Sequence, residues 1–196
     1  MPERFSVSTA KSGDCLRDHF LLAMPRLSEG IFSQSITYIC EHGEGGAMGI
    51  VINRPLDLSV SVIFEHMQIS SGGKFSEVPV MAGGPVQMDH GFVLHRYCDK
   101  SWEASLKVTS EITLTTSRDI LRAIAEDNGP EDHLIALGYA GWAAGQLEQE
   151  LAENSWLTLP GSGDIIFSTP AEQRLEAAAA LLGIDMNLIS GQAGHA

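Results

Sequence analysis

Short apolar segments, each ended by glycine, proline or a polar turn, constrain this fold more than any other feature of the sequence. The longest uninterrupted apolar runs are residues 20–24 and 177–182, whereas a membrane-spanning helix needs about 20 such residues. Segments this short and closely spaced are typical of strands joined by tight turns. About nine strands and four helices, with many strands adjacent in sequence, predict an α+β fold with a mixed, mostly antiparallel sheet.

No repeat and no linker divides the chain, so we expect a single domain over residues 16–196. A flexible N-terminal tail, residues 1–15, precedes it, because this segment is polar and rich in small residues. The sequence Glu-His-Gly-Glu-Gly-Gly at 41–46 predicts a hairpin loop. Strands are predicted, among other places, at residues 35–40, 47–53, 134–137 and 165–167.

Four segments show helical spacing of their apolar residues, and they cover residues 58–67, 117–127, 141–151 and 169–182. The last has the clearest start signal. Thr169 is predicted to cap it, Pro170 to take the first helical position and Glu172 to complete a capping box. Its apolar stripe is predicted to consist of Leu175, Ala178, Ala179 and Leu182.

The chain is strongly acidic. Its 12 Lys and Arg against 25 Asp and Glu give a net charge of −13. Residues 1–98 hold seven basic and ten acidic side chains, a net of −3, and residues 99–196 hold five and fifteen, a net of −10. DNA-binding domains carry a basic face, because neutralised phosphates supply most of their affinity. The charge therefore disfavours direct nucleic-acid binding and adhesion to anionic membranes.

Cysteine usage indicates a reducing compartment. The three cysteines, Cys15, Cys40 and Cys98, are odd in number and show no C-x-x-C spacing, so a disulfide framework is not expected. The N-terminus lacks the apolar run of a signal peptide, and we expect a cytoplasmic protein. Cys98 lies between Arg96 and Lys100, and nearby cations lower the pKa of a thiol, which makes Cys98 a candidate reactive group.

Motifs with a defined chemistry are missing from the sequence. It contains no P-loop and no dinucleotide-binding G-x-G-x-x-G, no nucleophile elbow and no histidine pair with zinc spacing. We therefore predict no metal, no cofactor and no assigned catalytic residue. An enzyme that uses His95 or a cysteine stays open as an alternative.

A glycine-rich junction at residues 138–145 is the segment nearest to a ligand site. A strand that leads into a helix there would point free backbone N–H groups at an anion. Gly141 is predicted to open the helix, with Trp142 and Gln146 on one face four residues apart. Together with Tyr139, these side chains form either ordinary packing or one wall of a ligand site.

Four motifs in a fixed order carry a resemblance to a known family. They are Leu-Ala-Met-Pro at 22–25, Gly-Ala-Met-Gly-Ile-Val-Ile-Asn-Arg-Pro at 46–55, Gly-Gly-Pro-Val at 83–86 with Gly-Phe-Val-Leu-His at 91–95, and Leu-Gly-Tyr-Ala-Gly-Trp at 137–142 with Gly-Gln-Leu-Glu at 145–148. The chain resembles the AlgH/YqgE family of bacterial proteins, most of them uncharacterised and often labelled transcriptional regulators. The resemblance implies a bifurcated sheet curled into a pseudo-barrel, and it brings no established catalytic residue.

The favoured hypothesis is a non-catalytic binding or regulatory protein, expected to be a monomer, with a small anionic ligand or a protein partner. Convergence of the glycine-rich turns would supply a cation, free N–H groups and an aromatic wall, which suit an anion. Regulation by direct DNA contact is the alternative that the charge disfavours, because no helix-turn-helix with a basic second helix is evident. The candidate ligand-binding residues are Arg54, Gly83, Gly84, His95, Tyr139, Trp142 and Gln146.

Overall fold

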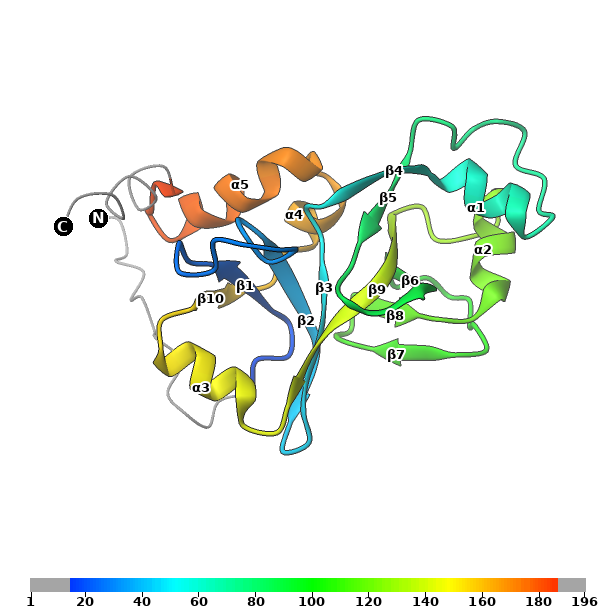
Figure 1. The fold of residues 1–196 in the computed structure, drawn as a ribbon. Coiled ribbons are helices and arrows are strands. Elements are labelled where there is room, and N and C mark those ends of the chain that lie inside the picture. The colour runs from blue at the N-terminus through cyan, green and yellow to red at the C-terminus, as the bar shows by residue number, and fades with distance from the viewer. Residues whose placement is uncertain (1–14, 187–196) are drawn as a thin grey trace, which may run out of the picture.

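A computed structural model describes residues 15–186, which form a ten-stranded sheet with five α-helices and one 3₁₀ turn packed on it (Figure 1). The α+β prediction is confirmed. All but Cys15 of the predicted N-terminal tail, together with residues 187–196, lies outside the described residues. The strands are β1 (His19–Ala23), β2 (Ile36–Gly43), β3 (Gly46–Val51), β4 (Pro55–Ser59), β5 (Pro79–Ala82), β6 (Val86–Arg96), β7 (Ser105–Lys107), β8 (Ile112–Thr115), β9 (His133–Ala143) and β10 (Trp156–Pro160).

The long strand β9 divides the sheet into two lobes, a first lobe with β10, β1, β2 and β3 and a second lobe with β4, β5, β6, β7 and β8. The main path runs β10-β1-β2-β3-β9-β6-β8-β7, and β6 pairs with one edge of β9 along most of its length. The other edge pairs in parallel with β5 at Ala136 and Leu137 and then antiparallel with β3 from Ala140 to Ala143. The sheet therefore forks at residues 138–139 and curls into a half-barrel, which confirms the expected bifurcation (Figure 1).

Glycines permit the chain to cross itself at this fork. A Cβ atom built on Gly83 or Gly84 would lie closer than 3.0 Å to backbone atoms of Gly138 or Tyr139. Gly138 has φ +73°, a left-handed conformation that favours glycine. Two peptide segments approach here more closely than any side chain would allow. These glycines are therefore required by the fold itself.

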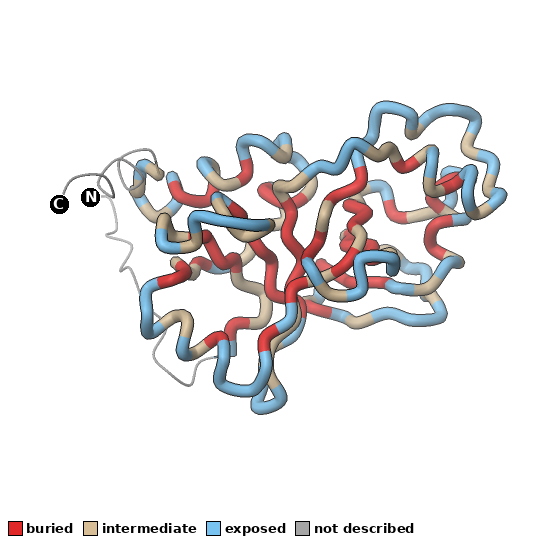
Figure 2. Tube along the Cα trace, in the orientation of Figure 1, coloured by how far each residue is buried: buried red, intermediate tan, exposed pale blue. Residues whose placement is uncertain are grey.

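Three apolar clusters fill the two lobes, and the buried residues follow the central strands (Figure 2). In the second lobe, α1 and α2 cover one face of β5, β6 and β9. In the first lobe, α4 and α5 pack on one face of the sheet and α3 on the other. The helices are α1 (Val60–His66), α2 (Arg118–Ala125), α3 (Gln146–Ala152), α4 (Gly163–Phe167) and α5 (Arg174–Leu181), with the 3₁₀ turn at Ala171–Gln173.

The strand predicted at residues 165–167 is wrong, because this segment belongs to helix α4. Its β-branched composition favours a strand, but Ser162 caps the helix by accepting the amide N–H of Ile165 at 3.5 Å. The helix buries Ile165 and Ile166 in the cluster under α5. Tertiary burial and a local cap thus override the intrinsic preference of the segment.

The helix predicted to open at Gly141 begins five residues later, at Gln146. Strand β9 continues to Ala143 because residues 140–143 pair with β3. The chain then turns at Gly145, the N-cap residue of α3, which has a left-handed φ of +76°. Trp142 and Gln146 therefore do not share a helix face.

The predicted capping box of the last helix does not form. Pro170 has ψ 142° and precedes the first turn, and no side chain caps it. Thr169 instead ends α4, since its amide N–H and hydroxyl both donate to the carbonyl of Asp164, at 3.0 and 3.2 Å. The predicted apolar stripe is confirmed, because Ala178 and Ala179 are buried and the two leucines pack beside them.

Arginines tie the curled sheet together. Arg96, at the end of β6, donates from Nε to Asp132 at 2.7 Å and from Nη2 to Asp164 of α4 at 2.9 Å, so it links the two lobes. Arg17, before β1, donates to the carbonyls of Lys107 and Val108 at the end of β7. It thus reaches the opposite end of the sheet. None of the helices described is long and apolar enough to cross a membrane.

Candidate functional site

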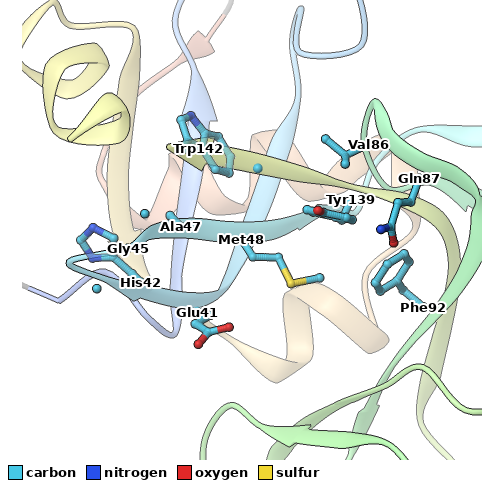
Figure 3. A pocket seen from close by; sticks show the side chains of 13 residues that line it. Glu41, His42, Gly45, Ala47, Met48, Val86, Gln87, Phe92, Tyr139 and Trp142 are labelled. Atoms are coloured by element: carbon cyan, nitrogen blue, oxygen red, sulfur yellow. The ribbon is translucent and has the colours of Figure 1, made fainter. Parts of the chain in front are cut away.

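A cleft of about 720 Å³ opens between the β2–β3 hairpin, the C-terminal part of β9 and the start of β6 (Figure 3). We call it the hairpin cleft. Its size lies within the range typical of small-molecule sites. The residues that line it are Glu41, His42, Gly43, Gly45, Gly46, Ala47, Met48, Val86, Gln87, Phe92, Tyr139, Gly141 and Trp142.

A β-bulge in β2 determines which side chains face the hairpin cleft. Ile39 pairs with Gly49, but the next pair is Glu41 with Met48, so Cys40 is the extra residue. A bulge of this kind reverses the alternation of the strand beyond it. Glu41 therefore lies on the same face as Met48, which packs against the cluster that contains Phe92.

An aromatic pair forms the apolar part of the hairpin cleft. The rings of Phe92 and Tyr139 meet edge to face, with centroids 5.5 Å apart. The Tyr139 ring lies close over Gly141, since a Cβ atom there would lie 3.2 Å from that ring and 3.8 Å from Val86, so a larger side chain at this position would have to displace the ring. The phenol oxygen of Tyr139 has no hydrogen-bond partner among residues 15–186. An aromatic surface with a free polar atom is thus offered to a ligand.

Trp142 reaches the hairpin cleft from the opposite face of β9. Successive residues of a strand point to opposite sides, so Tyr139 and Trp142 diverge. The indole N–H of Trp142 donates to Glu150 at 2.9 Å, as does that of Trp156 at 2.8 Å. Gln146 donates to the same carboxylate at 3.0 Å. Trp142 and Gln146 thus belong to a packed cluster around Glu150.

Hydrogen bonds hold His42 in one tautomer. Its Nδ1 accepts the amide N–H of Leu16 at 2.8 Å, so the proton resides on Nε2, which donates to Glu148 at 2.7 Å. The pKa of Glu148 is lowered by backbone hydrogen bonding and by His42. Both ring nitrogens are therefore occupied. His42 anchors α3 to the hairpin and has no free nitrogen with which to act on a ligand.

His95 lies inside the second lobe and does not line the hairpin cleft. Its Nδ1 donates to the carbonyl of Arg96 at 2.8 Å, and its Nε2 accepts from the Thr115 hydroxyl at 2.9 Å. The ring is 2% exposed. Burial holds the pKa of His95 below its ordinary value, and neighbouring His133 lowers it further. Burial also lowers the pKa of His133.

These lowered values predict acid sensitivity. Below the ordinary histidine pKa of 6.5, the unfolded chain binds more protons than the folded chain does. The free energy of unfolding therefore decreases as the pH is lowered. His95→Gln is expected to flatten this dependence. Urea unfolding from neutral to mildly acidic pH measures it, with His66→Gln, at an exposed position, as the control. An unchanged slope in His95→Gln would contradict the assignment.

The remaining predicted residues lie elsewhere. Arg54 follows β3, and its Nε donates to the carbonyl of Ile31 at 3.4 Å. Gly83 and Gly84 form the crossing at the fork. Of the seven, only Tyr139 and Trp142 line the hairpin cleft. Gly84 adjoins the Tyr139 backbone and Gln146 shares the Glu150 carboxylate with Trp142, but neither lines the cleft, and Arg54, Gly83 and His95 do not line it either. Ligand binding by any of the seven stays a prediction.

Sequence reasoning named only two of the residues that line the hairpin cleft as candidates, and among those that it missed are Glu41, Met48, Gln87 and Phe92. Gln87 has φ +50°, a left-handed conformation that is uncommon for a side chain other than glycine, asparagine or aspartate. No sequence signal marks it. Glu41 was visible only as part of a polar hairpin loop, because the bulge that turns it toward Met48 depends on pairing with β3.

Nucleophiles and metal ligands do not gather in the described part of the chain. Within residues 15–186, no group of three or more His, Cys, Asp or Glu side chains is arranged to hold a metal. Cys40 is buried, and burial raises the pKa of its thiol far above the ordinary value. Near Cys98, the Arg96 guanidinium is engaged by Asp132 and Asp164. The cations invoked for Cys98 are thus partly committed to other partners.

Comparison with known proteins gives a consistent result. Residues 20–187 match the model of a family described as AlgH-like. A UPF0301 protein of Thioalkalivibrio sulfidiphilus is 58% identical, over 91% of this chain and 96% of the relative. The solution structure of the AlgH protein from Pseudomonas aeruginosa is 46% identical, with a TM-score of 0.78 over 95% of this chain and 99% of that one. A crystal structure from Corynebacterium diphtheriae, 18% identical with a TM-score of 0.70 over 92% and 94%, shares the fold.

Proposed function

The chain belongs to the AlgH-like family, and we propose that it is a non-catalytic binding protein whose small-molecule site is the hairpin cleft. The observation that carries the proposal is the lining of this cleft. Apolar surface from Met48, Phe92 and Tyr139 is combined with a few polar groups, Glu41 and Gln87 among them. Small-ligand sites have this composition, in which apolar area supplies affinity and isolated polar atoms supply orientation.

The state of the ionisable groups supports binding over catalysis. A general base needs a free lone pair within reach of its substrate. His42 has both ring nitrogens engaged, by Leu16 and Glu148. His95, the group on which the enzyme alternative depends, is buried in the other lobe. We therefore rank the enzyme hypothesis second.

The predicted anionic ligand requires Arg54 at the site, and Arg54 lies outside the hairpin cleft. The proposal therefore retains a small ligand without assigning it a negative charge. Cytosolic location and a monomeric state are part of the same proposal, supported by the free cysteines and the high net charge. Direct DNA binding is not proposed, since a net charge of −13 opposes approach to phosphates.

Filling the cleft tests the proposal. Gly141→Leu places a side chain beside Tyr139 and Val86 at a position without a left-handed backbone. We expect the protein to fold and to lose binding of small aromatic probes by about tenfold or more, equivalent to about 1.4 kcal/mol. The probes are 3-methylindole, tryptamine and indole-3-acetate, and saturation-transfer difference NMR with titration measures their affinities.

Ala144→Leu is the matched control, since Ala144 is exposed and outside the cleft lining. It should bind the probes like the unmodified protein. Circular dichroism and thermal unfolding confirm that both variants fold. Failure of all three probes to bind the unmodified protein, or equal binding by Gly141→Leu, would refute the hairpin cleft as the ligand site.

A further inference from the structure

The described lining of the hairpin cleft has a negative charge and no positive charge from lysine or arginine. Of the described residues that line it, none is lysine or arginine, and Glu41 is the only carboxylate. His42 adds no positive charge while its Nδ1 accepts the Leu16 amide N–H. Glu44 stands beside the cleft at the turn of the same hairpin. An anion would therefore enter a negative field with no counter-ion in the lining.

The carboxylate of Glu41 is left without a partner. Among residues 15–186 the side chain of this exposed residue forms no hydrogen bond and no ion pair, whereas four other carboxylates are held by neighbouring elements. Glu148 holds His42, Glu150 holds two tryptophans, and Asp132 and Asp164 hold Arg96. The bulge at Cys40 is what directs Glu41 to the cleft side of the hairpin. A free carboxylate at the rim of an apolar cleft is complementary to an ammonium group.

The aromatic pair is complementary to the rest of such a ligand. Phe92 and Tyr139 meet edge to face. Phe92 is 5% exposed and backs the half-buried ring of Tyr139, which offers most of the aromatic surface to a flat molecule. Aromatic faces attract cations as well as other rings. The unpartnered phenol oxygen of Tyr139 and the amide of Gln87 provide hydrogen-bonding atoms nearby (Figure 3).

From this arrangement we propose that the ligand of the hairpin cleft is an aromatic amine in its ammonium form, with its ring against Phe92 and Tyr139 and its charge at Glu41. This inference rests on the proposed function. It names the chemical class that the cleft selects and excludes carboxylates and phosphates of the same shape. The selection comes from Glu41 and from the lack of a cation in the lining.

Three probes of one shape and different charge test the selection. At neutral pH, tryptamine carries an ammonium group, 3-methylindole is uncharged and indole-3-acetate carries a carboxylate. We expect tryptamine to bind at least about tenfold more tightly than indole-3-acetate, because attraction to one surface carboxylate is replaced by repulsion from it. The preference should weaken as salt is added, since the charges are partly exposed.

Glu41→Gln removes the charge and retains the shape of the side chain, and we expect it to abolish most of the preference for tryptamine. Glu44→Gln is the matched control, because Glu44 lies on the same hairpin outside the cleft lining. It should leave the preference nearly unchanged. Equal loss in both variants would mean that the overall field, and not Glu41, selects the charge, and would overturn the assignment.

The outcomes separate this inference from the proposed function. Equal binding of all three probes, each blocked by Gly141→Leu, would overturn the aromatic-ammonium assignment and leave the cleft as a binding site. Tighter binding of indole-3-acetate would likewise overturn it, in favour of the anion predicted from sequence. Binding of none of the probes would refute the proposed function itself.

Discussion

Gly84→Ala is expected to prevent the protein from folding stably. The added Cβ would lie closer than 3.0 Å to three backbone atoms, the C and O of Tyr139 and the N of Ala140. Backbone atoms in a paired strand cannot move aside as the end of a flexible side chain does. Hydrogen bonds also hold the two segments of the chain at the crossing. The Gly83 N–H donates to the Leu137 carbonyl, and the Val51 N–H donates to the Gly83 carbonyl, each at 2.8 Å.

We expect a loss of more than about 4 kcal/mol of unfolding free energy, which places this substitution among the rare severe ones. Urea unfolding monitored by circular dichroism measures it, or the recovery of soluble protein if none folds. Gly43→Ala is the control, because a Cβ atom at Gly43 meets nothing within 4 Å, and a change within about 0.5 kcal/mol is expected there. Near-native stability of Gly84→Ala would show that the two segments do not cross this closely.

The second large effect is expected at Arg174, the buried arginine at the start of α5. Its Nη1 donates to the carbonyl of Ile52 and its Nε to that of Thr169 at 3.0 Å, while the residue is only 8% exposed. Burial lowers the pKa of Arg174 to about 10, so the guanidinium stays charged near neutral pH. It joins the exit of β3 to the loop between α4 and α5.

Arg174→Met preserves apolar contacts and removes both donors. We expect it to cost about 2–3 kcal/mol, because the Ile52 carbonyl remains buried without a partner. Arg174→Lys should lose less, since an ammonium group retains a donor but not the fork that reaches two carbonyls. The control is Arg122→Met on the exposed side of α2, where a change within about 0.5 kcal/mol is expected. Equal stability of the two methionine variants would contradict a bridging role for Arg174.

The local elements were largely predictable. Strands β2 and β3 match their expected segments within a few residues, as do helices α1 and α2. The errors occurred where an apolar segment was short. Ile165–Phe167 has strand composition but is held in α4 by the Ser162 cap and by burial. The short strand β4 was missed although Leu56-Asp57-Leu58-Ser59 alternates apolar and polar residues, because Leu58 and Ser59 were assigned to the following helix.

The candidate site was predictable only in part. Tyr139 and Trp142 were singled out because they belong to a glycine-rich segment, and both line the hairpin cleft, although ligand binding by either stays a prediction. The predicted arrangement of the two side chains at a helix start was wrong, because β9 continues past Gly141 and the two side chains point to opposite faces of the strand. Arg54 and His95 were grouped with them on the premise that the glycine-rich turns converge. The fork at β9 separates these turns instead, with His95 inside one lobe and the hairpin in the other.

What the sequence determined by itself is the class of the protein and its local order. An acidic chain of short, glycine-bounded apolar segments specifies an α+β domain, and its motifs specify the AlgH-like family. These properties depend on neighbours along the chain. Tertiary structure alone decided that β9 carries three partner strands, that Gly84 touches Tyr139 and that Glu41 lies on the same face of the hairpin as Met48. Each of these depends on the pairing register between segments far apart in sequence, and a single extra residue in a strand reverses which face a side chain occupies.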